Sequence, residues 1–224
     1  MRNIKRILKE NDLGDMGIGA MIVFIAMVLV AGIAASVLIQ TANKLEIQAM
    51  TTGQETTREV ASGLQVMDIE GENTGLAGAI ARMTITVRAR AGSNDIDLAN
   101  TVVQLSNGTL KTILTYDKTA GQFNLSNEEN GSIFLTGPWD MSNAQFGILV
   151  LQDYDNSLSA QTPVLNRGDV VMLLINTDAC FTHAPAGLAP RDDVWGSVTP
   201  EEGAPGIFAF RVPSSINDRV YDLY

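Results

Sequence analysis

The chain has 224 residues, enough for one ordinary domain with an appendage or for two small domains. Its net charge of −10 argues against a nucleic-acid partner, because such binding needs Lys and Arg to replace the counterions along the phosphates. The single cysteine, Cys180, excludes an intrachain disulfide. Hydrophobic residues make up 46% of the chain, but they are densest near its N-terminus. The composition therefore indicates an apolar N-terminal block followed by a domain of ordinary polarity.

The first predicted element is this apolar block, which has no charged residue between Asp15 and Lys44. Three interpretations are open. A membrane anchor needs about 20 apolar residues, and residues 16–39 supply them, with the basic flank on the cytoplasmic side. A conventional secretory signal has a shorter apolar region, of about 7–15 residues. In a class III signal, cleavage falls before the apolar run and the helix stays in the mature protein.

Two features favour the third interpretation. The helical pattern continues beyond the apolar block, so we expect one helix from about Ile18 to about Met67. At 1.5 Å per residue it would be about 75 Å long, too long for the remaining domain to cover. The block is also rich in small residues, which let helix backbones approach closely. The positions expected to pack between helices are Gly17, Gly19, Ala31, Gly32, Ala35 and Ser36.

After the helix, the glycines of residues 71–79 predict a hinge. Apolar and polar residues then alternate in 82–90, which is typical of a half-buried strand. Further strands are expected at 102–105, 110–116, 133–135, 146–152, 170–176, 207–212 and 220–223. Asn107 and Gly108, between two of them, indicate a hairpin. The expected fold class is α+β, with a long N-terminal hydrophobic helix followed by an immunoglobulin-like antiparallel β-sandwich.

No group of residues indicates catalysis. Cys180 and His183, with Asp178 nearby, could form a thiol–base pair, but nucleophilic catalysis also needs an orienting group and an oxyanion site. Two such ligands fall short of a tetrahedral zinc set. The glycines near Asp15 follow no strand, so they are no dinucleotide-binding loop. We therefore expect a buried thiol, an exposed histidine, no enzyme activity and no cofactor.

Carboxylates occur in pairs in the predicted loops, at Asp95/Asp97, Asp153/Asp155, Asp192/Asp193 and Glu201/Glu202. Solvated acidic loops are the first interpretation, and a structural divalent cation is the alternative, because oxygen-rich loops can hold calcium. Arg167, Gly168 and Asp169 spell an integrin-type tripeptide, but their place directly before a strand favours a turn.

Three Asn-x-Ser/Thr sequons, at Asn107, Asn124 and Asn130, lie close together on predicted loops. An extracytoplasmic N-linked glycan could be accommodated there.

The segment GDMGIGAMIVFIAMVLVAGIAASVLIQTA resembles the N-terminus of archaellins, the archaeal flagellins that build the archaellum filament. LNRGDVVMLLIN and PEEGAPGIFAFRVPSS resemble archaellin C-terminal segments, whereas residues 91–161 match nothing familiar. Bacterial type IV pilins usually carry Glu at the fifth mature position, where this chain has Gly19, so the resemblance favours an archaellin. Ala20 stands where many archaellins have Thr, a small departure.

The resemblance implies that a prepilin-type peptidase cuts between Gly14 and Asp15, so that residues 1–14 are a class III signal peptide. Residues 15–70 would form the filament core and residues 80–224 its outer wall. The expected product is an extracellular homopolymer, or a co-polymer with related archaellins, that serves swimming motility and surface adhesion. It would start as a membrane-embedded precursor and depend on archaellum assembly and motor machinery. Frequent N-glycosylation in the family supports the sequons. The alternatives are an archaeal type IV adhesion pilin and a membrane-anchored ectodomain that does not polymerise.

Overall fold

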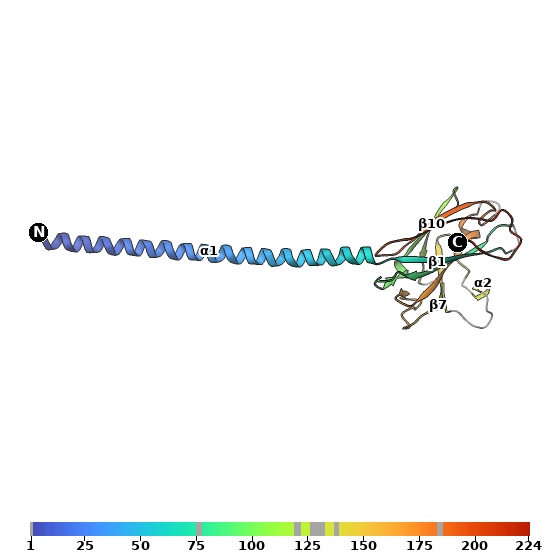
Figure 1. Cartoon of the computed structure of the whole chain (residues 1–224), viewed down its shortest axis with the longest axis horizontal. Coiled ribbons are helices and arrows are strands. Elements are labelled where there is room, and N and C mark those ends of the chain that lie inside the picture. The colour runs from blue at the N-terminus through green and yellow to red at the C-terminus, as the bar shows by residue number, and fades with distance from the viewer. Residues whose placement is uncertain (1, 75–77, 119–121, 126–132, 137–138, 183–185) are drawn as a thin grey trace. The chain divides into compact units, whose positions relative to one another are not determined.

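A computed structural model of the chain describes residues 2–74, 78–118, 122–125, 133–136, 139–182 and 186–224. Side chains are described from Gly17 onward, apart from Leu125, Leu135 and Thr136. The chain divides into two units, Met1–Glu55 and Thr56–Tyr224. The first unit is helical, and the second is built around a β-sheet (Figure 1).

The helix α1 spans Arg2–Ala61 and has 60 residues, which corresponds to about 90 Å at 1.5 Å per residue. Its sequence contains no proline, the residue that most strongly interrupts a helix, so the helix runs on without a break. It ends where Ser62 and Gly63 begin a tight connection. A Cβ at Gly63 would lie 2.7 Å from the carbonyl oxygen of Ala204, so only glycine fits there.

The predicted C-terminal end of the helix is wrong, because the next residues form the strand β1, Leu64–Glu72. A bulge between Val66 and Asp68 inserts an extra residue, which disturbs the alternation that identifies a strand. The predicted hinge at 71–79 is also wrong at its start, since Gly71 lies inside β1. A Cβ there would come within 2.8 Å of the Ile80 side chain. Gly75 lies outside the described residues.

The second unit has one large sheet of ten strands, in the order β11-β10-β4-β5-β7-β9-β2-β1-β12, with β6 also pairing with β7. β3 and β8 form a separate pair. The further strands are β2 (Arg82–Ala89), β3 (Ile96–Asp97), β4 (Val102–Ser106), β5 (Lys111–Tyr116), β6 (Phe123–Leu125), β7 (Gln145–Gln152), β8 (Val164–Leu165), β9 (Val170–Asn176), β10 (Asp193–Thr199), β11 (Gly206–Arg211) and β12 (Val220–Asp222). The short helices are η1 (Leu98–Asn100), α2 (Ile133–Thr136) and α3 (Thr177–Cys180).

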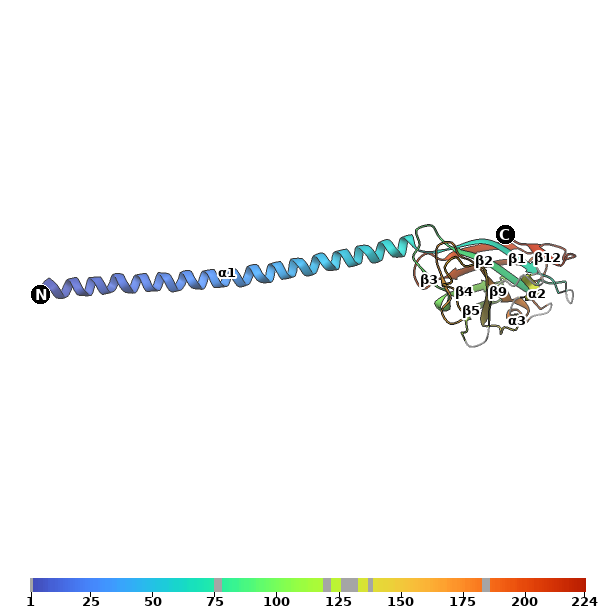
Figure 2. The same cartoon turned by 90° about the horizontal axis from the view of Figure 1, so that it is seen from below.

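The sheet consists of two antiparallel halves, which pair where β5 meets β7 and are also linked by a bridge between Gly63, just before β1, and Ala204, just before β11. β11, β10, β4 and β5 form one half, and β7, β9, β2, β1 and β12 form the other. The halves meet where Thr115 and Tyr116 of β5 pair in parallel with Gln145 and Phe146 of β7. Figure 2 shows β12, β1 and β2 side by side in the second half.

One core lies between the two halves. Val103, Leu105, Val198 and Phe208 from the first half belong to the same buried cluster as Ile85, Val87, Ile148 and Leu173 from the second. The sheet therefore curls so that both halves bury their inner faces together. This confirms the predicted α+β class, with a long apolar helix followed by an antiparallel β-sandwich whose layers are one curled sheet.

Most predicted strands are confirmed, as β2, β4, β5, β7, β9, β11 and β12, and so is the hairpin at Asn107 and Gly108. The predicted strand at 133–135 is wrong, because these residues form α2. A run of only a few apolar residues cannot be assigned by periodicity alone. The sequence reading missed β1 and β10 as well as the short β3, β6 and β8.

The outer face of the second half is covered by a segment of the same chain. Residues 133–136 and 139–141, here called the cover segment, contribute Phe134, Trp139 and Met141 to a second buried cluster. These side chains pack on Leu149 of β7 and on Met172 and Leu174 of β9. The Phe134 and Trp139 rings stack with their centroids 5.6 Å apart.

Candidate assembly interface

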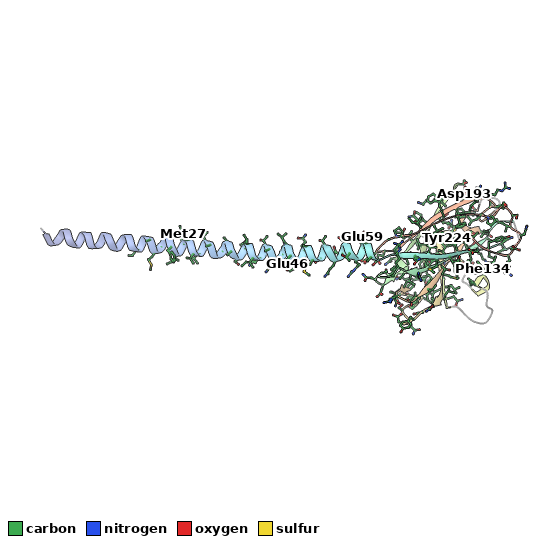
Figure 3. The ribbon with its side chains drawn as sticks, in the orientation of Figure 1. Met27, Glu46, Glu59, Phe134, Asp193 and Tyr224 are labelled. Atoms are coloured by element: carbon green, nitrogen blue, oxygen red, sulfur yellow. The ribbon has the colours of Figure 1, made fainter. Side chains whose placement is uncertain are left out.

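The apolar part of α1 is the most unusual surface of the molecule. Its large hydrophobic side chains from Ile18 to Ile39 are 53–71% exposed. The side chains of Met27 and Glu46 project from α1 in Figure 3. Soluble monomers rarely expose a contiguous apolar patch above a few hundred Å², and full burial of one such side chain is favourable by about 1.5–3 kcal/mol. The surface therefore requires lipid or other apolar helices around it.

Among the described residues, one helix is long and apolar enough to cross a membrane, Gly17–Ala61, with 45 residues. The first charge after Gly17 is Lys44, followed by Glu46, and further charges gather near Arg58. The helix thus changes along its length from a surface suited to hydrocarbon to one suited to water.

The six predicted packing positions all lie exposed on α1: Gly17, Gly19, Ala31, Gly32, Ala35 and Ser36. A Cβ at Gly17, Gly19 or Gly32 would meet no atom within 4 Å. Each glycine costs a helix about 0.8–1 kcal/mol relative to alanine. Nothing within the described chain offsets that cost.

The polar side chains in the middle of α1 are satisfied by the helix itself. The Thr41 hydroxyl donates to the Val37 carbonyl at 2.8 Å, and the Thr51 hydroxyl donates to the Ile47 carbonyl at 2.9 Å. Gln40 lies 3.5 Å from the Ser36 hydroxyl. A hydroxyl bonded to its own backbone can be buried without an unsatisfied donor. This part of α1 is therefore also suited to burial among helices.

A cluster of three carboxylates forms at the connection between β7 and β9. Oxygen atoms of Asp153, Asp155 and Asp169 lie within 4.8 Å of one another. Burial alone would raise the pKa of Asp155, but hydrogen bonds from Ser157 and Asn166 lower it below its ordinary value. Carboxylate oxygens suit Ca²⁺, yet the same oxygens already accept hydrogen bonds that shape the turn. These hydrogen bonds give the cluster a structural role in the turn.

The other predicted carboxylate pairs also have structural partners. Asp97 accepts a hydrogen bond from the Ala99 amide and so caps η1. The Asn100 amide bridges Asp97 and Glu201. Asp193 pairs with Arg211 at 3.5 Å in an exposed position.

The integrin-type tripeptide is a turn, as predicted. Gly168 has a φ of 108°, in the region that favours glycine, and Asp169 is only 2% exposed. The Asp169 carboxylate accepts hydrogen bonds from the amides of Tyr154 and Asn166. It therefore cannot project as a ligand.

The thiol of Cys180 is buried, as predicted, and burial raises its pKa to about 12. Its Sγ lies 3.8 Å from the carbonyl oxygen of Asn143. A thiol that stays protonated at neutral pH is a poor nucleophile. His183 lies outside the described residues.

The sequons differ in how they are presented. Asn107 lies in the β4–β5 hairpin, where its Oδ1 accepts hydrogen bonds from the amides of Thr109 and Leu110. These bonds leave the Nδ2 atom, which would carry a glycan, unused. Asn124 is half-buried in β6, opposite Leu149 of β7. Asn130 lies outside the described residues.

No sequence pattern indicated the ion cluster around the buried Glu72 at the end of β1. The Glu72 side chain is 1% exposed and pairs with Arg82 at 3.3 Å and with Arg219 at 2.9 Å. It borders a cavity of about 420 Å³. Because Glu72 and Arg219 are 147 positions apart, no local pattern could have revealed the pair. The cluster fastens the C-terminal strand to β1.

A long helix whose apolar surface must be covered by lipid or by other helices, joined to a β-sheet domain, is the arrangement of a membrane-anchored or filament-forming protein. The model of the family described as archaeal-type flagellin matches residues 14–210. Flagellin B2 of Methanocaldococcus jannaschii is 43% identical over 202 residues, which cover 90% of each chain.

Solved structures agree. The crystal structure of archaeal flagellin FlaB1 from Methanocaldococcus jannaschii superposes with a TM-score of 0.62 at 30% identity, covering 73% of this chain and 97% of that one. The archaeal flagellum of Methanospirillum hungatei strain JF1 gives a TM-score of 0.62 at 16% identity, covering 91% and 98%, and so shares the fold. The chain belongs to the archaeal-type flagellin family. It is a structural subunit of the extracellular archaellum filament and not an enzyme.

Proposed function

We propose that the chain is made as a membrane-embedded precursor and that a prepilin-type peptidase cuts it between Gly14 and Asp15. The mature subunit then leaves lipid and enters a bundle of identical α1 helices, alone or with related archaellins. The observation that carries this proposal is the uncharged, 53–71% exposed apolar surface of α1. Exchange of lipid for apolar helices keeps that surface away from water throughout.

Close packing of the bundle rests on the small residues of α1. Ala31 and Ala35, and likewise Gly32 and Ser36, stand four positions apart and so lie one above the other on the helix. Gly17 and Gly19 supply the same freedom near the mature N-terminus. Helix contacts at such positions bring backbones together and gain van der Waals contact in the absence of water. Copies related by one rotation and translation then form an open filament.

The curled sheet forms the outer wall and meets the surroundings, and swimming follows when archaellum motor machinery turns the filament. An N-linked glycan on this wall is best accommodated at Asn107, whose Nδ2 is left unused by the hairpin. Asn124, half-buried in β6, would need the strand to move, and Asn130 remains a candidate from its sequon alone.

The test is N-terminal sequencing of the protein sheared from cells, together with its intact mass. We expect the sequence to begin at Asp15. Retention of residues 1–14 would instead support a membrane-anchored ectodomain. Deletion of the gene should abolish swimming, whereas loss of adhesion with swimming intact would support an adhesion pilin. An intact mass equal to that of the unmodified mature chain would exclude the glycan.

A further inference from the structure

The outer faces of the two sheet halves differ in whether other residues of the chain cover them. The cover segment packs Phe134 and Trp139 on the second half, where both are at least nine-tenths buried. On the first half, Trp195, Ile113 and Ile207 point outward and are 49%, 56% and 71% exposed. The chain thus covers the outer face at β7 and β9, whereas these three apolar side chains of the first half are left exposed.

The open face is contiguous across four strands and uncharged over its centre. Strand alternation places Ile207, Ala209, Trp195, Ser197, Gln104 and Ile113 on it, because Phe208, Val198, Leu105 and Leu114 point into the core. In the register, Ile207 pairs with Ser197, Ser197 with Gln104, and Gln104 with Ile113, so these residues form one row across four strands. We call these six residues the Trp195 face. They carry no charge in a chain whose net charge is −10.

Cations border this face. The Lys111 ammonium lies over the Trp195 ring, 5.5 Å from its centroid, and Arg211 pairs with Asp193 at the same end of the strands. An exposed aromatic side chain among neutral residues, with charged side chains at the border, is typical of the centre and rim of a protein interface. Of the bordering charges, Lys111 has no carboxylate partner among the ion pairs of the described residues. The acidic surface of another copy of this chain is electrostatically complementary to that rim.

We propose that the Trp195 face is covered by a second copy of this chain in the filament. The proposal rests on the filament role, since only a polymer holds identical neighbours at fixed positions around every subunit. Copies related by rotation and translation meet through different surfaces. The Trp195 face therefore contacts another region of its neighbour, and the outer walls are joined laterally in addition to the helix bundle.

Hydroxyl-radical footprinting read by mass spectrometry tests the proposal on native filaments and on the same protein dissociated in mild detergent. The chain has two tryptophans, and Trp139 serves as the internal control because it is 9% exposed in the single subunit. If assembly buries Trp195 to the level of Trp139, its accessible fraction falls from 49% to 9%, about a fivefold decrease in oxidation. Equal oxidation of Trp195 in both states would overturn the proposal and leave the filament role intact.

Two further outcomes are decisive. Protection of Trp195 in dissociated subunits that disappears on deglycosylation would show that a glycan covers the face, and would also overturn the proposal.

Filaments carrying Ile207→Glu should dissociate at lower temperature or detergent concentration than filaments carrying the matched control Ile207→Val. Equal resistance of the two variants would contradict it. Failure of Ile207→Glu to form filaments, with normal filaments for Ile207→Val, would also support the proposal. Failure of the wild type to form filaments would count against the filament role instead.

Discussion

Replacing Gly32 with leucine separates what the single helix requires from what the filament requires. In the isolated chain, a Cβ at Gly32 meets no atom within 4 Å, so a larger side chain has room. Leucine is also a better helix former than glycine by about 0.8 kcal/mol, and it keeps the segment apolar. We therefore expect α1 and the membrane-embedded precursor to tolerate Gly32→Leu fully.

The filament should not tolerate this change. If Gly32 lies where helix backbones approach closely, the added side chain overpacks the contact, which costs about 1–3 kcal/mol. That free energy corresponds to about a 5- to 150-fold weaker association of each subunit. Val30→Leu is the matched control, because Val30 is already 68% exposed and large.

The assay compares precursor in the membrane fraction with protein in sheared filaments, and measures the temperature at which filaments dissociate. We expect normal precursor with few or labile filaments for Gly32→Leu, and wild-type behaviour for Val30→Leu. Filaments of Gly32→Leu with wild-type yield and thermal resistance would refute close packing at this position.

Three other results should follow from the sheet domain. Glu72→Ala should lower the unfolding free energy by about 2–3 kcal/mol, less than for a fully buried pair because the Arg219 side chain is 63% exposed, as measured by thermal unfolding. Burial, followed by the charges of Asp68 and Asp222, raises the pKa of Glu70. The folded state therefore loses stability as the pH rises from the ordinary pKa of Glu70 through its raised pKa. Glu70→Gln should raise Tm at neutral pH and leave Tm unchanged at low pH, where Glu70 is protonated in both states. Cys180, with a pKa of about 12, should react with a thiol reagent at pH 8 only after unfolding, and stability should fall between about pH 9 and pH 12 because only the unfolded thiol ionises there.

The helix was predictable because apolar residues continue over many turns of α1. Most strands were predictable from the alternation of apolar and polar residues. β10 was missed because Gly196 stands in its middle, where glycine ordinarily marks a break. The structure gives the reason for that glycine. A Cβ at Gly196 would lie 2.3 Å from the carbonyl oxygen of Gln104 and 2.5 Å from the Phe208 ring.

The functional surfaces were predictable to different degrees. The apolar surface of α1 was predictable from the sequence, because a long run of hydrophobic residues without a charge is a local property of the chain. The Trp195 face was not found, since it takes its residues from four strands that are brought together only by the sheet register. The cluster at Glu72 was hidden for the same reason. Surfaces built from distant segments leave no periodic trace in the chain.

The first strand of the domain, β1, pairs with the last strand, β12, so the sheet is complete only when the C-terminal residues are present. β1 is hydrogen-bonded to β12 through Gly71 and Tyr221 and their neighbours, and the amide of Leu223 donates to Ile69 at 2.8 Å. Without residues 219–223, this edge of β1 would be open. Chains truncated before that point would carry an unpaired edge and a buried Glu72 with one partner fewer. The C-terminal residues therefore protect a strand edge and a buried carboxylate that lie about 150 positions earlier in the chain.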